Sequence, residues 1–341
     1  MNSLPFLSVV VLNYNAGKYI VACLKSILES SYKNLEIILV DNQSLDGSIE
    51  TLKSSLTARE LAGIRIIINK TNLGAAIALN QGARIATGKY ITFVATDTLV
   101  DKDCFLHLVE SFEDDPSVGG ASSKLLMMHK PDAFDSAGEY LSQYGILIQR
   151  HAGQEIDRGQ FNQKDEIFSA KGTALTVRAE AFKSIGMFPE DYFMFLEETD
   201  LCWRIWLVGY RIIFVPDALI FHARGASVNA STNRNYLVKY FGTRNYIMTL
   251  IKNFGFMRFM TIVPVNILMW FGLSIFLIIR GRIKEGWFVM RGILWNIFNL
   301  NKILEGRAKV QKLRRIPDSL FLGRVLKHIP LSYLFNLTKG W

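Results

Sequence analysis

The chain has 341 residues and a mass of 38.7 kDa, which allows one large domain or two domains of ordinary size. Half of the residues are apolar and 20% are charged, so the composition excludes a disordered or low-complexity chain. The three cysteines, Cys23, Cys104 and Cys202, are widely spaced, which excludes a disulfide scaffold and a clustered zinc site and fits a reducing compartment.

The net positive charge of the chain, +9, lies at its C-terminal end. Residues 1–243 carry 23 basic and 27 acidic side chains, whereas residues 244–341 carry 16 basic and 3 acidic ones. The C-terminal part is also the most hydrophobic, and a segment that is both basic and apolar indicates an anionic membrane surface rather than nucleic acid. Because residues 1–5 lack the basic start of a signal peptide, we expect residues 1–243 to stay in the cytosol.

The first hundred residues alternate between short β-branched runs and segments with helical periodicity. The runs are apolar nearly throughout, as expected of strands that are buried on both faces of a parallel sheet. The predicted strands are Leu7–Leu12, Leu35–Val40, Ile64–Ile68 and Tyr90–Val94, and the predicted helices are Lys18–Glu29, Ser48–Leu56 and Ala75–Ala86. This alternation predicts an α/β fold with an open, doubly wound, mostly parallel sheet.

Polar residues follow each of the four predicted strands. These polar segments are Asn13–Asn15, Asp41–Ser48, Asn69–Gly74 and Ala95–Asp97. Parallel strands bring their carboxyl ends to one edge of the sheet, which is where open α/β sheets bind their ligands. The sequence has no G-x-G-x-x-G after the first strand and no G-x-x-x-x-G-K-[ST], which argues against a Rossmann dinucleotide site and a P-loop.

Two aspartates at these strand ends are candidates for ligand binding. Asp41 ends the second strand, where a carboxylate accepts hydrogen bonds from a nucleobase or a ribose hydroxyl, whereas the nearby Asp46 is expected to cap a helix. Asp97 follows the fourth strand, where a carboxylate holds Mg²⁺ or Mn²⁺ between two phosphates. The alternative for Asp97 is a cap on a helix over residues 101–110.

A cluster of three acidic residues interrupts an aromatic stretch near residue 200. If a helix begins here, Glu197 and Asp200 lie near one face and Glu198 points about 100° away. A carboxylate framed by Phe195 and Trp203 has a raised pKa, which suits a general base. The alternative is an acidic helix start that satisfies free backbone N–H groups.

Several short segments, in a fixed order along the chain, carry a resemblance to a known family. They are Ser8–Asn15, Val40–Ser48, Asn72–Gly74 with Asn80, Gly88–Tyr90, Thr96–Thr98, Lys171–Ala174, Ile185–Phe188, Glu197–Arg204, His222 with Gly225–Ser227, and Arg244–Asn245. Over roughly residues 6–250 the chain resembles the inverting family 2 glycosyltransferases, and most closely their rhamnosyltransferase-like branch. The resemblance implies the nucleotide-diphospho-sugar transferase (GT-A) fold, with a nucleotide-sugar-binding half at 1–125 and an acceptor half at 126–243.

The resemblance also implies roles for individual residues. Glu198 takes the position of the catalytic base, with Glu197 and Asp200 as alternatives, and Asp97 holds Mg²⁺ or Mn²⁺ with His222 as a second ligand. The implied nucleotide contacts are Leu12, Tyr14, Asn15, Asp41, Asn72, Gly74 and Thr96, and the implied sugar and acceptor contacts are Gly172, Ala174, Trp203 and Arg204.

The sequence departs from the family pattern at two places. Ala95 stands where the first carboxylate of the metal motif often falls, and the usual Glu-Asp pair of the acceptor side is replaced by Glu197 and Glu198. The extra methylene displaces the carboxylate by roughly one bond length, and catalysis tolerates little misplacement.

The chemistry implied is a metal-assisted single displacement that inverts the anomeric configuration of the donor sugar. The expected donor is dTDP-rhamnose or a UDP- or GDP-sugar, and the expected acceptor is a saccharide or a lipid-linked intermediate of cell-surface polysaccharide synthesis. No nucleic acid partner is expected, and a homo-oligomer remains open. The alternative is a catalytically inactive nucleotide-sugar-binding scaffold at the membrane.

The C-terminal region, residues 244–341, is predicted to be helical and to associate with a membrane. Residues 259–279 are 21 uncharged positions, and as a helix they extend about 31 Å, close to the hydrocarbon thickness of a bilayer. A spanning helix, a helical platform in the interface and a dimer interface remain open. We favour a monotopic or re-entrant anchor at the cytoplasmic face of the cell membrane, with residues 287–300 at the interface.

Overall fold

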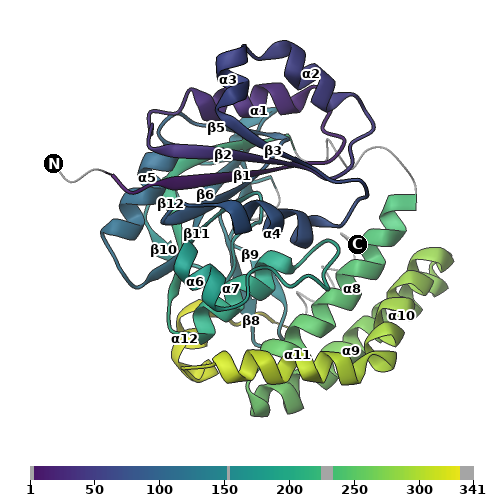
Figure 1. Ribbon diagram of the computed structural model, residues 1–341. Helices are drawn as coiled ribbons and strands as arrows, with labels where there is room; N and C mark the ends of the chain where they lie inside the picture. Colours follow the sequence, from purple (N-terminus) through teal and green to yellow (C-terminus); the bar gives the residue numbers. More distant parts are fainter. Residues whose placement is uncertain (1–3, 152–153, 224–232, 331–341) are drawn as a thin grey trace. The chain divides into compact units, whose positions relative to one another are not determined.

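The structure is a computed structural model that describes residues 4–151, 154–223 and 233–330 (Figure 1). Its internal contacts divide the chain into two compact units. The first unit comprises Met1–Glu139 and Gln149–Asn229, and the second comprises Tyr140–Ile148 and Ala230–Trp341. The predicted domain boundaries at residues 125 and 243 stay a prediction.

The first unit contains a sheet of ten strands with the order β10-β12-β6-β11-β4-β1-β2-β3, in which β5 also pairs with β12 and β7 with β6 (Figure 1). Strands β3, β2, β1 and β4 are parallel, whereas β11 runs antiparallel to both β4 and β6. The strands are β1 (Leu7–Asn13), β2 (Leu35–Asp41), β3 (Ile64–Ile68), β4 (Tyr90–Ala95), β5 (Thr98–Val100), β6 (Val118–Met127), β7 (Lys130–Ser136), β10 (Asp165–Glu166), β11 (Ala174–Arg178) and β12 (Arg211–His222). The four strands predicted from the sequence are confirmed, each within one residue.

Seven helices accompany this sheet within the described part of the first unit. They are α1 (Tyr19–Leu28), α2 (Ser48–Ser55), α3 (Ala58–Ala62), α4 (Ala75–Ile85), α5 (Cys104–Glu113), α6 (Ala179–Ser184) and α7 (Glu197–Leu207). Helices α1 and α5 pack on one face of the sheet, and α4, α6 and α7 lie on the other (Figure 1).

The alternation of side chains along β1 explains this arrangement. Val9 and Val11 join the buried cluster formed with α1 and α5, whereas Val10 faces the opposite side. There Gly82 of α4 approaches Val10 so closely that a Cβ at residue 82 would lie 2.5 Å from its side chain. Both faces of β1 are therefore covered, which accounts for its unbroken apolar sequence.

Two predicted helix starts are corrected by the structure. The cap position of α2 is Gly47, in the left-handed conformation with φ 73°, and Asp46 lies one residue earlier, where its Oδ1 still accepts the Ser48 N–H at 3.1 Å. Helix α5 begins at Cys104 rather than 101. The short strand β5 separates it from Asp97, so the alternative role of Asp97 as a helix cap is wrong.

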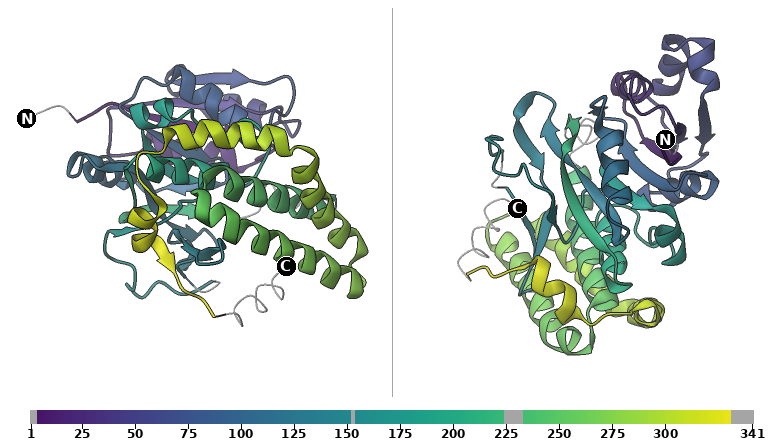
Figure 2. Two further views of the ribbon diagram at one scale, coloured as in Figure 1. Left: turned by 90° about the horizontal axis from the view of Figure 1, so that it is seen from below. Right: turned by 90° about the vertical axis from the view of Figure 1, so that its left-hand side faces the viewer.

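The second unit is mainly helical (Figure 2). Helix α8 packs against three neighbouring helices, and a small sheet has the strand order β13-β8-β9. The elements are β8 (Glu139–Ser142), β9 (Leu147–Gln149), α8 (Asn233–Asn253), α9 (Phe256–Ile279), α10 (Ile283–Phe298), α11 (Leu300–Leu313), α12 (Asp318–Val325) and β13 (Leu326–Lys327). The predicted helical C-terminal region is confirmed, and its apolar helix, α9, starts three residues before the predicted segment.

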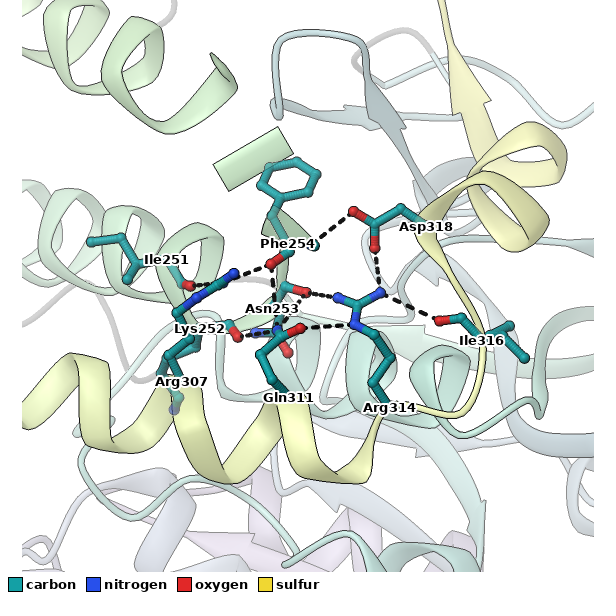
Figure 3. Close-up of polar contacts among 10 residues, drawn as sticks. Ile251, Lys252, Asn253, Phe254, Arg307, Gln311, Arg314, Ile316 and Asp318 are labelled. Atoms are coloured by element: carbon teal, nitrogen blue, oxygen red, sulfur yellow. Dashed lines mark hydrogen bonds and ion pairs between the residues drawn. The ribbon is translucent and has the colours of Figure 1, made fainter. Parts of the chain in front are cut away.

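The junction between α8 and α9 is held by side chains from a distant part of the chain (Figure 3). Arg307, Gln311 and Arg314, in and just after α11, donate hydrogen bonds to the carbonyl oxygens at the C-terminal end of α8. Asp318 then binds both Arg314 and the N–H of Gly255, at 2.6 and 2.8 Å. Two guanidinium groups at a helix C-terminus bind its free carbonyl oxygens and interact favourably with the negative end of the helix dipole. The junction is therefore well fixed within the second unit.

Candidate functional site

Asp97 and His222 meet because strands β5 and β12 pair. The antiparallel register sets His222 opposite Thr98, and the N–H of Ala223 donates to the carbonyl oxygen of Asp97 at 2.9 Å. The Nε2 atom of His222 consequently lies 3.4 Å from Oδ1 of Asp97, and both side chains are largely buried. The structure thus brings together the two residues that the family resemblance assigns to the metal, although 125 residues separate them in sequence.

A third residue, Asp135 of β7, holds the other side of the histidine ring. Its Oδ2 lies 2.8 Å from Nδ1 of His222. Burial lowers the pKa of His222, but the neighbouring carboxylates of Asp135 and Asp97 outweigh this effect and raise the pKa to about 9. Sequence reasoning missed Asp135, because only the pairing of β7 with β6 and of β6 with β12 brings it to His222.

The Asp97 and His222 pair fits a divalent cation. A carboxylate oxygen and an imidazole nitrogen are ligands of the kind that Mn²⁺ accepts, and Mg²⁺ is commonly bound through one or two carboxylates plus substrate phosphates. Within residues 4–151, 154–223 and 233–330, no group of three His, Cys, Asp or Glu side chains is arranged as a metal site by itself. The remaining ligands would therefore have to come from the phosphates of a bound nucleotide or from water.

The acidic start of α7 carries two carboxyl groups with raised pKa values. Burial and then the neighbouring charge of Glu198 raise the pKa of Glu197 to about 8, and its Oε2 atom is buried without a hydrogen-bond partner among the described residues. Burial also raises the pKa of Glu198, partly offset by Lys171 and by the backbone N–H of Gly172. A carboxyl group of this kind is suited to accepting a proton near neutral pH.

Lys171 interacts electrostatically both with Glu198 and with Asp135, the residue that binds His222. Its Nζ lies 2.6 Å from Oε1 of the buried Glu139. Burial lowers the pKa of Lys171, but the charges of Glu139, Glu198 and Asp135 together raise it. Lys171 is thus close enough to interact with both Glu198 and Asp135.

Asp97, His222 and Glu198 therefore lie in one region of the first unit. The connection runs from Asp97 to His222, on to Asp135, and through Lys171 to Glu198. Glu139 and Lys171 are the further charged residues here. The sequence offered Lys171 as part of a motif but gave no signal for Glu139.

Asp200 is placed differently from the two glutamates. It is fully buried and accepts a hydrogen bond from Nε of Arg204 at 2.7 Å, while Arg204 also donates to the carbonyl oxygens of Ile185 and Met187. This pair fastens α7 to the 185–187 segment. A base needs access to an acceptor hydroxyl, so the geometry favours a structural role for Asp200 and for Arg204.

Trp203 and Ala174 are also packed in the interior. Trp203 is 1% exposed and meets the ring of Phe168 edge-on at 5.0 Å, and Ala174 lies buried in β11. Gly172 is different, because a Cβ built on it would lie 3.7 Å from the Cβ of Glu198. Of the four predicted sugar and acceptor contacts, Gly172 is therefore the one placed beside Glu198.

Asp41 uses both carboxylate oxygens within the chain. Oδ1 accepts from Nδ2 of Asn13 at 2.7 Å and Oδ2 from the N–H of Ser44 at 3.1 Å, and the residue is 2% exposed. Asp41 thus joins the carboxyl ends of β1 and β2. Tyr14 is exposed beside this junction, whereas Leu12, Asn15 and Asn72 are partly exposed, so Tyr14 is the most accessible of the predicted nucleotide contacts.

The predicted contacts at the ends of β3 and β4 are likewise held by local hydrogen bonds. Asn72 Oδ1 accepts from the N–H of Gly74 at 2.9 Å, and a Cβ on Gly74, which has φ 84°, would lie 2.5 Å from the carbonyl oxygen of Phe193. Gly74 therefore closely contacts the segment that leads into α7. Thr96 is buried and donates its N–H to the carbonyl oxygen of Leu12 at 3.3 Å.

A family model and several known proteins match this chain. The family model described as "Glycosyl transferase family 2" matches residues 8–185. Glycosyltransferase GlyG of Streptococcus pneumoniae serotype 4 is 28% identical over 226 residues, which are 64% of this chain and 70% of GlyG. Poly-beta-1,6-N-acetyl-D-glucosamine synthase of Staphylococcus aureus (strain COL) is 26% identical over 208 residues, which are 60% of this chain and 47% of the synthase. The chain thus spans about half the length of that second relative.

Two solved structures share the fold. GalNAc-T7 with UDP, GalNAc and Mn²⁺ has a TM-score of 0.55 at 16% identity and covers 73% of this chain and 51% of its own. The mannosyltransferase PcManGT from Pyrobaculum calidifontis, in complex with GDP-Man and Mn²⁺, has a TM-score of 0.53 at 18% identity. The match covers 87% of this chain and 88% of PcManGT. The predicted GT-A-type fold, with a large central sheet and a helical C-terminal region, is confirmed.

Proposed function

The chain belongs to glycosyl transferase family 2, and from this premise we propose that it transfers a sugar from a nucleotide-sugar donor to a hydroxyl group of a saccharide or lipid-linked acceptor in cell-surface polysaccharide synthesis. The observation that carries the proposal is the meeting of Asp97 and His222 in the same region as Glu198. The name of GlyG supports sugar transfer, and the name of the poly-beta-1,6-N-acetyl-D-glucosamine synthase supports the role in polysaccharide synthesis.

Glu198 is the residue that we propose as the general base. It removes the proton from the acceptor hydroxyl as that oxygen attacks the anomeric carbon, and the bond from this carbon to the diphosphate oxygen breaks with both electrons leaving on the diphosphate. The anomeric configuration is inverted, and no sugar is attached to the protein. Burial raises the pKa of Glu198, which makes its carboxylate a stronger proton acceptor than an exposed glutamate.

Asp97 and His222 are the residues that would hold Mg²⁺ or Mn²⁺. The cation, when bound, would neutralise the charge that develops on the diphosphate leaving group. Asp97, in the turn before β5, and His222, at the end of β12, bring their donor atoms to one place. Ala95 stands where the first carboxylate of the family's metal motif often falls, and Thr96 directly precedes Asp97. Mn²⁺ is also named for the two proteins of similar fold.

The donor is proposed as a dTDP-, UDP- or GDP-sugar, with rhamnose as the sugar favoured by the sequence resemblance. The names of the relatives and of the structural neighbours refer to other sugars, namely N-acetylglucosamine, GalNAc and mannose. The proposal of rhamnose therefore rests on the order and type of the short motifs alone.

We place the protein at the cytoplasmic face of the cell membrane, anchored through the second unit. Helix α9 is long and apolar enough to cross a bilayer by length and composition, with a mean hydropathy of 2.4. Only 28% of its most apolar stretch is buried inside the protein. Its exposed apolar side chains are Phe256, Met257, Met260, Val265, Leu268, Phe271, Ile275, Phe276, Ile278 and Ile279. Trp287 of α10 is also exposed, and basic residues at 280, 282 and 284 follow α9, as expected of an anchor at an anionic surface.

The decisive experiment is a thermal-shift screen of UDP, dTDP and GDP with and without Mn²⁺, followed by turnover assays with the matching sugar donors. We expect one nucleotide to raise the melting temperature more strongly with Mn²⁺ present, because a ligand at a hundred times its Kd stabilises the fold by about 2.7 kcal/mol. Binding without turnover of any donor would favour the inactive scaffold, and neither binding nor turnover would reject the proposal.

A further inference from the structure

The ring of His222 lies between two carboxylates, one from the turn before β5 and the other from β7. Asp97 lies on the Nε2 side at 3.4 Å and Asp135 on the Nδ1 side at 2.8 Å. The shorter contact is a hydrogen bond, whereas the longer one leaves Nε2 directed toward the carboxylate of Asp97 without close hydrogen bonding. The two sides of the ring are therefore not equivalent.

We propose that Asp135 is a positioning residue that fixes the orientation and the tautomer of His222, so that Nε2 is presented to a divalent cation bound at Asp97. An imidazole binds a metal through an unprotonated nitrogen, and the nitrogen that keeps its proton usually donates it to a carboxylate or a carbonyl group. Asp135 Oδ2 is placed to accept that proton from Nδ1. The inference rests on the proposed metal-dependent transfer and adds a residue that none of the sequence motifs contains.

The backbone around Asp135 is itself held in place. Asp135 lies in β7 between Phe134 and Ser136, which pair with Leu126 and Leu125 of β6. Its own carbonyl oxygen lies 3.1 Å from Nε2 of the buried His151. Such a fixed carboxylate restricts the rotation of the His222 ring, as expected of a group that orients a metal ligand.

The charges around the His222 ring also favour a cation bound at Asp97. Asp97 and Asp135 are both largely buried, and Lys171, the nearby cation that interacts with Asp135, is already paired with Glu139 at 2.6 Å. Two buried carboxylates beside one imidazole are stabilised by a positive charge at this place. A divalent cation at Asp97 would supply that charge, while a neutral His222 contributes its nitrogen.

The test measures Mn²⁺ binding by the full-length protein directly, from the electron paramagnetic resonance signal of free Mn²⁺, with Mn²⁺ alone and with Mn²⁺ plus UDP. Asp135→Ala removes the acceptor, and we expect it to weaken Mn²⁺ binding roughly 10- to 100-fold, which is the usual effect of losing such a partner. Asp135→Asn keeps an acceptor oxygen in the same position, so we expect it to retain most of the affinity. A purely structural role for the negative charge predicts no such rescue.

Glu166→Gln is the matched control. It removes a carboxylate from an ion pair with Arg211 in the same sheet, at 2.8 Å, and we expect unchanged Mn²⁺ affinity. If Asp135→Ala does not fold, Asp135→Leu fills a similar volume without an acceptor and replaces it. Wild-type protein that binds no Mn²⁺ under either condition would reject the metal in the proposed function and this inference with it. Equal binding by the wild type and the acceptor-free variant would overturn the inference alone.

Discussion

The two units of the chain place polar and apolar side chains in opposite ways. In the first unit, carboxylates such as Asp41, Asp97 and Asp135 are largely buried at or next to the ends of strands and are bound by neighbouring polar groups. In the second unit, apolar side chains of α9, such as Leu268 and Phe271, remain exposed. Buried charge and exposed apolar surface both lower the stability of a soluble fold. A protein that keeps either feature therefore uses it for a function.

The comparison separates two kinds of requirement. Charges buried beside a strand end need a fixed scaffold, which the ten-stranded sheet provides. Exposed apolar surface needs only a stable helix and an apolar surrounding, and the second unit provides the helix, with the junction before α9 held by Arg307 and Arg314. Variants in the first unit should therefore affect chemistry or folding, and variants on α9 should affect location.

The largest expected effect is that of Glu198→Gln. Removing the proposed base should reduce sugar transfer by about 10²- to 10⁴-fold, because glutamine cannot accept the proton of the acceptor hydroxyl. Nucleotide affinity should change little, which a thermal-shift titration would show. Glu197→Gln is the control at the neighbouring position. Full turnover by the Glu198 variant would show that another residue is the base.

Asp200→Ala should act through folding rather than chemistry. It leaves Arg204 buried without its carboxylate partner, and breaking a buried pair in this way costs about 3–5 kcal/mol. Denaturant unfolding would measure the loss. A variant of normal stability but without activity would contradict the structural role and return Asp200 to the list of candidate bases.

A double variant on α9, Leu268→Glu with Phe271→Glu, should reduce binding to vesicles that contain anionic lipid. Fully burying each apolar side chain contributes about 1.5–3 kcal/mol, so we expect at least a tenfold loss in a flotation assay. The stability of the protein should stay within about 0.5 kcal/mol, because both side chains are exposed.

Leu45→Glu offers a control for this variant in the other unit. Leu45 is 84% exposed but lies in the first unit, and its replacement should leave vesicle binding unchanged. Equal losses for the two proteins, or unchanged binding of the α9 variant, would argue against α9 as the anchor.

A further expected effect is a change in the pH dependence of stability. In the unfolded chain Glu197 loses its proton near its ordinary pKa of 4.5, whereas burial raises the pKa to about 8 in the folded protein. The folded state then binds more protons between these values, so this group lowers stability as the pH rises from 4.5 to 8. Glu197→Gln should therefore gain in melting temperature relative to the wild type at pH 8 but not at pH 4.5. A parallel pH dependence of both proteins would contradict the raised pKa.

Local sequence determined several elements of this protein. The apolar runs that became β1–β4 could be predicted because a strand covered on both faces needs apolar side chains at every position, and α9 could be predicted because its apolar stretch is long and uncharged. The polar ends of β1–β4 also followed, since parallel strands share one carboxyl edge.

Tertiary structure alone decided which of the polar residues face one another. Asp135 reaches His222 only through the pairing of β7, β6 and β12, and Asp200 is bound by Arg204 in the interior although its position in the motif suggested a base. Burial and strand register depend on contacts between residues far apart in the chain. The sequence therefore determined which chemical groups are available, and the packing of the sheet decided which of them share a site.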